Sequence, residues 1–517
     1  MQIKILYAAA RNAVLEIEDG GLYHTKEEYH IRLNGKPFCR TDKVITNLFG
    51  LFPDTDYHLE VCAAHGTEAL TFHTLYESVT LNVRDFGAAG DGRSDDTLFI
   101  QAAIQACPPD GRVRIPAGEY RIRCLFLKSN LRICLDKGAL VKADTSRTDL
   151  PLLPGMVETW DEQGEYNLGT WEGNPLITHT GIFTGLYLEN VEIYGEGVID
   201  GGASFDGWWK KDQTKILPAR PRLLFLNHCD HVTVQGLLFR NSPSWNLHPY
   251  FCKDVNFFGT EVKNPAVSPN TDGLDPESCD GVRVLGMRFS VGDDCIAVKS
   301  GKIYMGRKYR TPCKNIEIRQ CLLENGHGAV TIGSEMAGGV VGLRVKDCVF
   351  RHTDRGFRLK TRRGRGKDAV IDDITITNVL MEHVKTPFVI NCFYYCDPDG
   401  HTSYVQKRTE VPADERTPDI RRLTFSKIRC TGCEVQAAYI EGLPEKMIEE
   451  LTFSDVLFSF DEEALPDLPA MADGVSECCR KGMFISNVRK LTLHAVSVEG
   501  QEGPPYIIQG EGNYEIL

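Results

Sequence analysis

The sequence lacks any apolar stretch that approaches the roughly 18 uncharged residues of a membrane-spanning helix. It also lacks a basic excess, because 58 Lys and Arg residues stand against 71 Asp and Glu residues and give a net charge of −13. That charge argues against nucleic acid as a partner. Low-complexity tracts are missing too, and 42% hydrophobic and 25% charged residues are typical of a globular protein. We therefore expect a globular protein with neither a membrane nor a nucleic acid as partner.

The N-terminus lacks the long apolar run of a secretory signal. The best candidate, Ile5 to Ala10, is short, and strand-like alternation follows it. We therefore expect a cytoplasmic protein. An extracellular or periplasmic location is the alternative if a leader has been removed.

Residues 1–78 differ in pattern from the rest of the chain. Short alternating runs such as AVLEIE, YHIRLNG and YHLEVCA predict a small antiparallel β-sandwich. The stretch around Tyr57 resembles the tyrosine corner of fibronectin type III modules. Such a module is either a carbohydrate-binding domain or a structural cap. The cap is favoured, because no aromatic platform stands out.

Residues 79–517 begin with a Gly-rich turn and a predicted helix near residues 95–107, with Asp95 or Asp96 as its N-cap. This helix would plug the open end of a parallel coil, which otherwise exposes apolar side chains and strand edges. Its expected apolar stripe is Leu98, Ile100, Ala103, Ile104 and Cys107.

An apolar-x-apolar motif then recurs along the chain. Between Val232 and Ile374 its starts lie 23 to 34 residues apart. Leucine-rich and ankyrin arrays keep a much tighter period, so the pattern predicts an all-β parallel β-helix of about ten irregular coils. The starts are Val191, Val232, Val255, Val282, Ile316, Leu343, Ile374, Leu423, Leu451 and Leu491.

The 18 cysteines include no pair of CxxC motifs of the kind that zinc sites use. Cys229, Cys252, Cys279 and Cys313 each precede a repeat start by three residues. Side chains at equal phase in successive coils lie about 4.8 Å apart. They form either a metal ladder or a stack of reduced core thiols. The stack is favoured, because no His or Asp shares their phase.

Polar residues gather at another phase. Asp293 and His327 each lie eleven residues after a repeat start, and Asp272 lies in a long turn of the neighbouring coil. Arg358 and Lys360 lie beyond the same position of a further coil. Each residue alone is more often part of a solvated turn. Their convergence on one edge predicts a groove for a linear polymer.

The motifs NTDG (270–273), GDD (292–294), GHG (326–328) and RLK (358–360) occur in the order found in glycoside hydrolase family 28, which the chain resembles over roughly residues 80–510. In that family the last motif is most often RIK. The resemblance implies a right-handed, pectin-lyase-like parallel β-helix without a metal or cofactor. It also implies hydrolysis of α-1,4-galacturonosidic bonds in polygalacturonate or its oligomers.

The resemblance implies a role for each motif residue. Asp293 would be the general acid, Asp272 and Asp294 would activate water, and His327 would orient and tune the acid. An inverting glycosidase needs such an acid and base, with carboxyl groups roughly 6.5–9.5 Å apart. Three crowded carboxylates should also raise at least one pKa.

Arg358 and Lys360 would bind the galacturonate carboxylate, since an Arg side chain can engage a carboxylate with two hydrogen bonds. The basic run from Arg351 to Lys367 would add a local positive field. The other candidates for substrate binding are the turn residues Asn270 and Gly328, and the wall residues Trp245 and His248. Trp160 and Trp171 are further candidate wall residues.

Exo action is favoured over endo action. The fibronectin-like module and the segment NSPSWNLHPY resemble bacterial exo-acting members of the family. Long turns around residues 155–175 and 395–418 would close a groove into a pocket.

Several alternatives remain. A hydrolase of rhamnogalacturonan or of another pectic oligosaccharide is less favoured, because the histidine of GHG is kept. A calcium-dependent pectate lyase would have no use for GHG and RLK, and a non-catalytic β-helix binding protein would have lost an aspartate. The expected partner is a galacturonate-containing oligo- or polysaccharide. The oligomeric state is left open.

Overall fold

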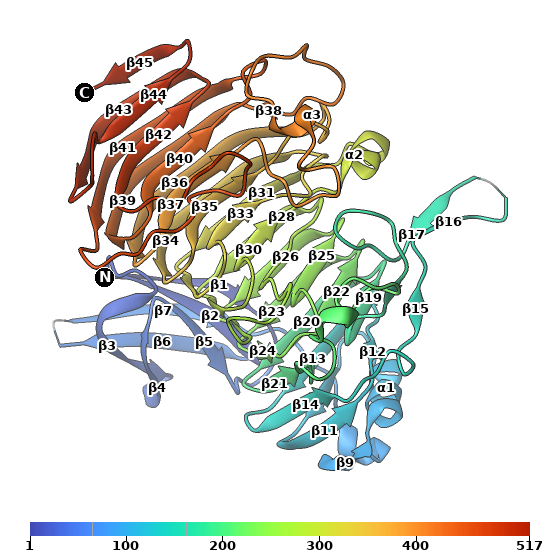
Figure 1. Ribbon diagram of the computed structural model, residues 1–517. Coiled ribbons are helices and arrows are strands. Elements are labelled where there is room, and N and C mark those ends of the chain that lie inside the picture. Colours follow the sequence, from blue (N-terminus) through green and yellow to red (C-terminus); the bar gives the residue numbers. More distant parts are fainter. Residues whose placement is uncertain (65, 162) are drawn as a thin grey trace.

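The computed structural model describes residues 1–64, 66–161 and 163–517. Its strands wind into a right-handed parallel β-helix, with a small β-sandwich at the N-terminus (Figure 1). Within the described residues, no helix combines the length and apolarity needed to cross a membrane.

The sandwich consists of the antiparallel sheets β1-β2-β5 and β4-β3-β6-β7, as predicted. The Tyr57 hydroxyl accepts a hydrogen bond from the backbone N–H of Phe52 at 2.8 Å, which is the contact expected of a tyrosine corner. The strands are β1 (Gln2–Ala8), β2 (Asn12–Glu18), β3 (His24–Leu33), β4 (Lys36–Lys43), β5 (Ile45–Phe49), β6 (Asp56–Ala63) and β7 (Gly66–His73).

The coil has three faces. Two of them are columns of one large sheet that bends within each coil. The first column contains β8 (Thr80–Asn82), β10 (Arg112–Ile115), β13 (Leu131–Leu135), β20 (Glu189–Gly195), β23 (Asp230–Gln235), β26 (Lys253–Phe258), β28 (Asp280–Leu285) and β31 (Cys313–Arg319). The second contains β9 (Asp91–Asp95), β11 (Gly118–Ile122), β14 (Ala139–Ala143), β21 (Val198–Asp200), β24 (Leu238–Arg240), β27 (Glu261–Lys263), β29 (Arg288–Ser290) and β32 (Leu322–Glu324).

Toward the C-terminus, single long strands extend this large sheet. They are β34 (Val340–Arg351), β36 (Val370–Glu382), β39 (Arg422–Cys433), β41 (Ile448–Phe460) and β43 (Val488–Glu499), with the shorter β38 (Asp419–Ile420) and β45 (Asn513–Ile516). The third face has a four-stranded sheet, β12 (Leu125–Phe126), β19 (Phe183–Leu186), β22 (Leu224–Asn227) and β25 (Leu247–Tyr250). It continues as a seven-stranded sheet, β30 (Ile296–Val298), β33 (Val330–Ile332), β35 (Arg355–Lys360), β37 (Thr386–Asn391), β40 (Gln436–Glu441), β42 (Lys481–Ser486) and β44 (Tyr506–Gln509).

The predicted repeat starts pair with one another in a single register. Val191 pairs with Val232, Val232 with Val255, and the ladder continues through every predicted start to Leu491. This part of the prediction is confirmed. The expected number of about ten coils is too low, because β8, β10 and β13 precede Val191 and β45 follows Leu491 in the same ladder.

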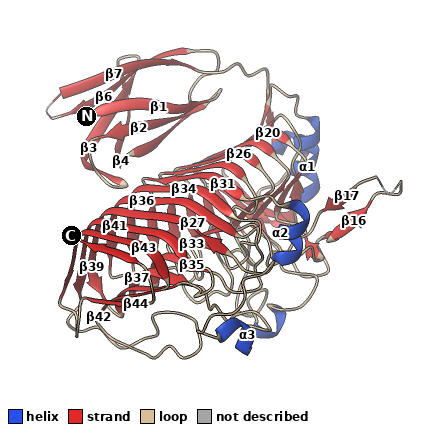
Figure 2. Cartoon of the chain, turned by 90° about the horizontal axis from the view of Figure 1, so that it is seen from above, coloured by secondary structure: helices blue, strands red, loops and turns tan. Residues whose placement is uncertain are grey.

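Glycine at the bend between the two columns also makes room for the sandwich. The residue four positions after a start has a positive φ, for example 76° at Gly236 and 69° at Gly286. A Cβ at Gly236 would lie 2.4 Å from the ring of Phe49, and one at Gly286 would lie 2.4 Å from Cβ of Ile45. Nearby, Ile45 packs into an apolar contact with Phe258 of the coil. The sandwich is therefore held against the coil by a buried apolar interface, and Figure 2 shows the sandwich lying beside the coil.

The predicted helix is α1 (Thr97–Ala106), at the N-terminal end of the coil. Asp96 occupies the N-cap position, but its carboxylate accepts from the backbone N–H groups of Ala89 and Gly90 and does not cap the helix. Leu98 was wrongly assigned to the apolar stripe: it is 78% exposed, since it lies roughly 200° around the helix from the stripe. The stripe residues that are buried are Ile100, Ala103, Ile104 and Cys107.

The four in-phase cysteines lie in the core, as predicted. Cys229, Cys252, Cys279 and Cys313 are buried free thiols. The Cys252 sulfur accepts from the backbone N–H of Cys229 at 3.3 Å. Burial raises the pKa of the Cys313 thiol to about 12, so the inner thiols stay protonated and pack as small apolar groups.

Insertions project from the coil on the side away from the sandwich (Figure 2). One carries the small pairs β15 (Leu152–Leu153) with β18 (Thr178–His179), and β16 (Met156–Glu158) with β17 (Glu165–Asn167). Others carry α2 (Ile303–Tyr309) and α3 (Ser403–Gln406). Two 3₁₀ turns, Val83–Phe86 and Lys211–Gln213, complete the elements. These insertions decide how open the third face is.

Candidate active site

Three aspartates meet where turns lead into the seven-stranded sheet. Asp293 and Asp294 lie in the turn before β30, separated from it by Cys295, and Asp272 lies in the preceding coil, which joins its neighbours there through isolated bridges. The backbone N–H of Gly273 donates to the Asp294 carbonyl at 3.0 Å and fixes the two turns in register. One oxygen of each carboxylate lies within 4.8 Å of the other two. The structure thus brings together the three carboxylates that the sequence predicted.

The distance between the carboxylates differs from the expectation. Oxygens within 4.8 Å of one another are closer than the roughly 6.5–9.5 Å that separates the carboxyl groups of an inverting pair. The turns of adjacent coils follow one another at the spacing of strands in a sheet, about 4.8 Å, which explains the close approach. Carboxylate spacing alone therefore does not identify the acid and the base.

Asp294 is a fully buried carboxylate that two cations hold in place. Lys360 Nζ donates to its Oδ2 at 2.7 Å, and Arg358 Nη1 donates to its Oδ1 at 3.3 Å. Both cations project from β35 at alternate positions, which puts them on the same face of the sheet. Burial acts to raise the pKa of Asp294, but Lys360 and Arg358 outweigh it and hold that pKa well below its usual range. Asp294 is therefore ionised throughout the neutral range.

Asp272 has a raised pKa, as expected of one carboxylate in the group, and burial is the main cause. Its burial raises its pKa well above the ordinary value, and the nearby charges of Asp293 and Asp275 add to the effect. Lys299 Nζ, 3.9 Å from the Asp272 carboxylate, opposes this rise without cancelling it. Because the carboxylates interact strongly, they share protons as a group. The site therefore keeps a proton available beside an ionised Asp294.

Asp293 and His327 form the open rim of this group. The Asp293 side chain is 23% exposed and the His327 side chain 52% exposed. His327 Nδ1 lies 3.5 Å from Asp293 Oδ1, and the hydrogen bond to Asp293 raises the pKa of the imidazole. Asp293 is thus the aspartate of the three that a bound sugar reaches most directly, with His327 beside it.

A buried cation that the sequence analysis missed lies beneath the aspartates. Lys299 Nζ lies 3.0 Å from Glu335 Oε2, 3.6 Å from Asp275 Oδ1 and 4.5 Å from the ring centre of Trp245. The signal in the sequence was a lysine that directly follows the apolar strand residues IAV. Lys299 neutralises part of the negative charge that would otherwise gather under the site.

Trp245 and His248 do not form the wall that we expected. Both are buried, with their rings in edge-to-face contact at 4.9 Å. His248 Nε2 pairs with Glu277 Oε2 at 2.9 Å, and Trp171 stacks on Trp245 at 6.1 Å. The insertion that carries Trp171 covers this part of the third face, so these rings support the site from below. Trp160, between β16 and β17, is 97% exposed and therefore does not form a wall either.

The two turn residues shape the site through the backbone. Asn270 has a φ of 54°, and its side-chain oxygen accepts from Arg220 Nη2 at 2.6 Å. This contact anchors the turn that presents Asp272. A Cβ at Gly328 would lie 2.3 Å from Thr331 Oγ1 and 2.8 Å from Asp294 Oδ1. The glycine of GHG is therefore required by space, and the structure offers no side chain there to bind substrate.

The basic run of residues 351–367 does not act as one positive field. Only Arg358 and Lys360 of that run pair with an aspartate of the site among the described residues. The others turn away: Arg351 pairs with Glu382, Arg355 donates to Pro469 and Leu468 carbonyls, Arg362 and Arg365 pair with Asp397, Arg363 with Glu445, and Lys367 with Glu415. Residues that are neighbours in sequence thus diverge in space, and the cations other than Arg358 and Lys360 are bound by groups outside the aspartate site.

Three insertions converge around the aspartates. The backbone N–H of Lys302 donates to Gly173 of the first insertion, and its Nζ pairs with Asp397 of the second at 3.0 Å. A third segment brings Met471, whose sulfur lies 2.9 Å from Arg358 Nη2. The carboxylates therefore lie beside insertions that are tied to one another.

The aspartate group is also close enough to bind a metal ion in principle. Two cations already contact Asp294, and Lys299 lies near Asp272. These charges would repel a divalent cation. The donor set therefore fits proton transfer better than metal binding.

The chain is similar to known proteins in sequence and in fold. The chain is 28% identical over 380 residues to a protein of Vitis vinifera named probable polygalacturonase, with 72% of each chain covered. An exopolygalacturonase structure from Thermotoga maritima has a TM-score of 0.64 and 26% identity, and covers 81% of this chain and 93% of its own. The family 28 exopolygalacturonase of Yersinia enterocolitica has the same fold over 99% of this chain and 98% of its own, with a TM-score of 0.73 and 19% identity.

Two family models match successive parts of the coil. Residues 80–138 match "Rhamnogalacturonase A/epimerase, pectate lyase-like", a region without the aspartates. Residues 146–465 match "Glycosyl hydrolases family 28", which spans all four sequence motifs and well over half of the chain. The chain therefore belongs to glycosyl hydrolase family 28.

Proposed function

We propose that this protein hydrolyses α-1,4-galacturonosidic bonds in polygalacturonate or its oligomers. One observation carries the proposal: three aspartates within 4.8 Å of one another, of which Asp294 is bound by Lys360 and Arg358. The aspartates supply the acid and base that hydrolysis needs. The two cations have further donors that can hold the carboxylate of a galacturonate residue.

The aspartates divide the work by their exposure and charge. Asp293, on the open rim, donates a proton to the leaving oxygen, with His327 orienting it. Asp294, kept ionised, and Asp272 hold and activate the attacking water. The proton that the water loses passes to the ionised Asp294, and it can move on to Asp293 after each turnover and restore the acid, because the carboxylate oxygens are so close.

We propose that the reaction inverts the anomeric centre. A retaining enzyme needs a carboxylate that is free to bond to the sugar carbon. Asp294 is tied to two cations and Asp272 is buried beside Lys299, so both suit water activation better than covalent attack. The NMR spectrum of the first-formed product tests this. Release of the β-anomer is expected, and the α-anomer would assign a nucleophile to one of the aspartates.

We further propose that the enzyme acts from a chain end. The linked insertions around Gly173, Asp397 and Met471 support this, because together they crowd the third face around the aspartates. A series of defined oligogalacturonates gives the test. Exo action releases one constant small product from every length, whereas a spread of internal fragments would show endo action.

The same digests separate hydrolysis from lyase chemistry. An unsaturated product, seen by its ultraviolet absorbance, would indicate elimination and reject the proposal. A chelator should leave the rate unchanged, because Lys360, Arg358 and Lys299 already supply positive charge at the aspartates.

A further inference from the structure

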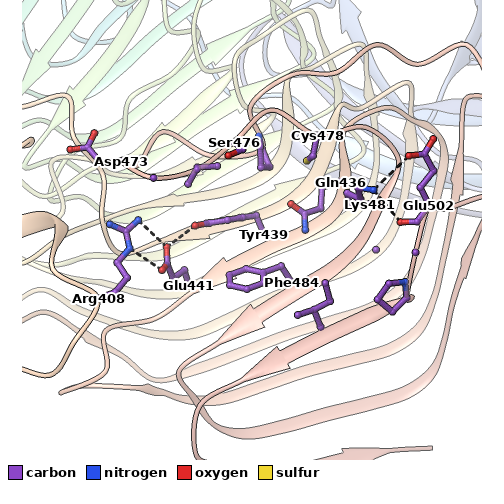
Figure 3. Close-up of a pocket in the computed structure, with 17 residues that line it drawn as sticks. Arg408, Gln436, Tyr439, Glu441, Asp473, Ser476, Cys478, Lys481, Phe484 and Glu502 are labelled. Carbon is purple, nitrogen blue, oxygen red and sulfur yellow. Dashed lines mark hydrogen bonds and ion pairs between the residues drawn. The ribbon is translucent and has the colours of Figure 1, made fainter.

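The seven-stranded sheet carries a pocket toward the C-terminus, away from the aspartates (Figure 3). This cavity has a volume of about 720 Å³, which is in the range of small-ligand sites. Its floor consists of side chains from β40, β42 and β44, and residues 469–478 form a wall. The proposed reaction uses none of its residues.

A short segment separates this distal pocket from the aspartates. Asn391 Nδ2 donates to the Met471 carbonyl at 3.0 Å, and Ala470 packs with Val389 and Tyr439. The segment thus crosses the sheet at β37, between Arg358 and the pocket. Arg358, Val389 and Tyr439 are register partners on successive strands, so Tyr439 lies roughly 10 Å from Arg358 along the sheet. The pocket is therefore a second compartment on the same face as the catalytic group.

Aromatic and aliphatic side chains dominate the pocket. The rings of Tyr439 and Phe484 lie 5.3 Å apart with an angle of 31° between them. Ile507, Val475 and Pro504 extend this apolar surface. An aromatic ring offers a flat apolar face, and the Tyr hydroxyl adds a polar tip. Such a lining suits a ring that is apolar on its faces and polar at its edges.

Both cations of the pocket are paired with carboxylates within it, as the dashed lines in Figure 3 show, and a further carboxylate, Asp473, pairs with His401 outside it. Arg408 pairs with Glu441 at 3.0 Å, and the Tyr439 hydroxyl donates to the same carboxylate at 2.6 Å. Lys481 pairs with Glu502 at 3.6 Å. An anionic ligand would have to compete with carboxylates that are already in place, and burying its own charge unpaired would be costly.

We propose that the distal pocket binds an uncharged pyranose ring of a pectic substrate. Two sources share that chemistry: a methyl-esterified galacturonate, and a neutral sugar. The proposal rests on the proposed function for its choice of a pectic ligand. The sheet would then bind two different parts of the substrate. Arg358 and Lys360 would bind a free carboxylate, and Tyr439 and Phe484 would bind an uncharged ring.

Titration calorimetry on the full chain tests this. The Asp293→Asn background slows turnover during the titration, and three probes are used: fully methyl-esterified trigalacturonate, unesterified trigalacturonate and methyl α-galactopyranoside. Phe484→Ala should weaken binding of the esterified trimer relative to the unesterified one by about tenfold, or ~1.4 kcal/mol. Phe52→Ala, an exposed aromatic residue of the sandwich, is the matched control and should change neither affinity.

A second variant tests whether the effect of Phe484→Ala comes from misfolding. Ile507→Asp places a negative charge on the exposed rim of the pocket and should also weaken the esterified trimer, with an unchanged circular dichroism spectrum. Loss of methyl galactoside binding in both variants would assign the pocket to neutral sugars. An effect on the esterified trimer alone would assign it to esterified galacturonate.

Two results keep this proposal apart from the proposed function. If the wild-type chain fails to cleave unesterified trigalacturonate, the function fails, whatever the pocket binds. If it cleaves that trimer but the two pocket variants bind all three probes as Phe52→Ala does, the pocket proposal is overturned. If the wild-type chain binds neither the esterified trimer nor methyl α-galactopyranoside, the pocket proposal is overturned as well.

Discussion

The site has an open rim and, beneath the aspartates, a buried layer that we call its base. Each contains carboxylates beside a group that can carry positive charge, but the rim is partly exposed and the base is buried. At the rim, Asp293 and His327 are partly exposed and meet at 3.5 Å. At the base, Lys299 lies between Asp275 and Glu335, and all three are buried. The rim can exchange protons with water and with a substrate, whereas the base can only fix charge. We infer that the rim carries the chemistry and that the base sets the electrostatic field in which it occurs.

The largest effect should come from the rim. Asp293→Asn keeps the shape of the side chain but cannot donate the proton, so kcat should fall by about 10²–10⁴-fold. Because Asp293 is partly exposed, the melting temperature should change little. Steady-state kinetics and thermal unfolding measure the two effects. Asp373→Asn, at an exposed aspartate of the coil, is the control, and equal activity in both variants would remove Asp293 from catalysis.

The base should respond in the opposite way. Lys299→Met leaves Glu335, Asp275 and Asp272 buried without their common cation, which should cost about 3–5 kcal/mol of unfolding free energy. Lys299 helps to hold the pKa of Glu335 below its ordinary value against the effect of burial. A depressed carboxyl pKa stabilises the fold above the unfolded pKa, near 4.3, and this stability is lost as the pH falls.

The loss of unfolding free energy in Lys299→Met should therefore depend on pH. It should be largest at neutral pH and shrink toward pH 4, where the carboxyls of the variant become protonated. Urea unfolding at several pH values measures it. Lys367→Met, at an exposed lysine, is the matched control. A deficit that does not depend on pH would show that Lys299 acts by packing alone.

Lys360 connects the two regions. Lys360→Ala should lower kcat/KM for unesterified substrate. The corresponding loss of transition-state stabilisation should exceed about 1.5 kcal/mol, the lower end for hydrogen bonds to charged groups. The substitution should also raise the pKa of Asp294, because burial remains while one of the two cations that oppose it is gone. The acid limb of the pH profile of kcat/KM should then move to higher pH. An unchanged pH profile would show that Lys360 does not control the protonation of Asp294.

Much of the coil could be predicted because its signal is periodic. The starts from Val191 to Leu491 repeat an inward apolar pair, and parallel pairing keeps equal phases together, so even the cysteine stack followed. The coils before Val191 were left out of the predicted number, because their sequence shows a helix and strands that do not match the repeat. Leu98 was assigned wrongly because its apolar character was given more weight than its angle around the helix, which places it roughly 200° from the buried stripe.

The site could be predicted where it depends on the coil and not where it depends on insertions. Asp293 and His327 lie at one phase of the repeat and Asp272 lies in a turn of the neighbouring coil, so their meeting followed from the repeat. Trp245 and His248 were misread because an insertion distant in sequence covers them. Lys299 was missed because a single buried lysine has no pattern, and its partner Glu335 comes from the next coil.

The smallest effect should come from a cation that belongs to neither region. Arg351 precedes Arg358 and Lys360 in the same basic run, so a field spread over the run would include it. It is 41% exposed on another face of the coil, where it pairs with Glu382 at 2.7 Å. Solvent screens such a charge over about 10 Å at 0.1 M salt, and exposed ion pairs contribute little. Arg351→Ala should therefore leave kcat/KM for unesterified oligomers within about twofold of wild type at low and high salt. The measurement is a salt series of kcat/KM for this variant beside Lys360→Ala. If Arg351→Ala lost activity at low salt and recovered it at high salt, the basic run would act as a common field after all, and the division into rim and base would have to include it.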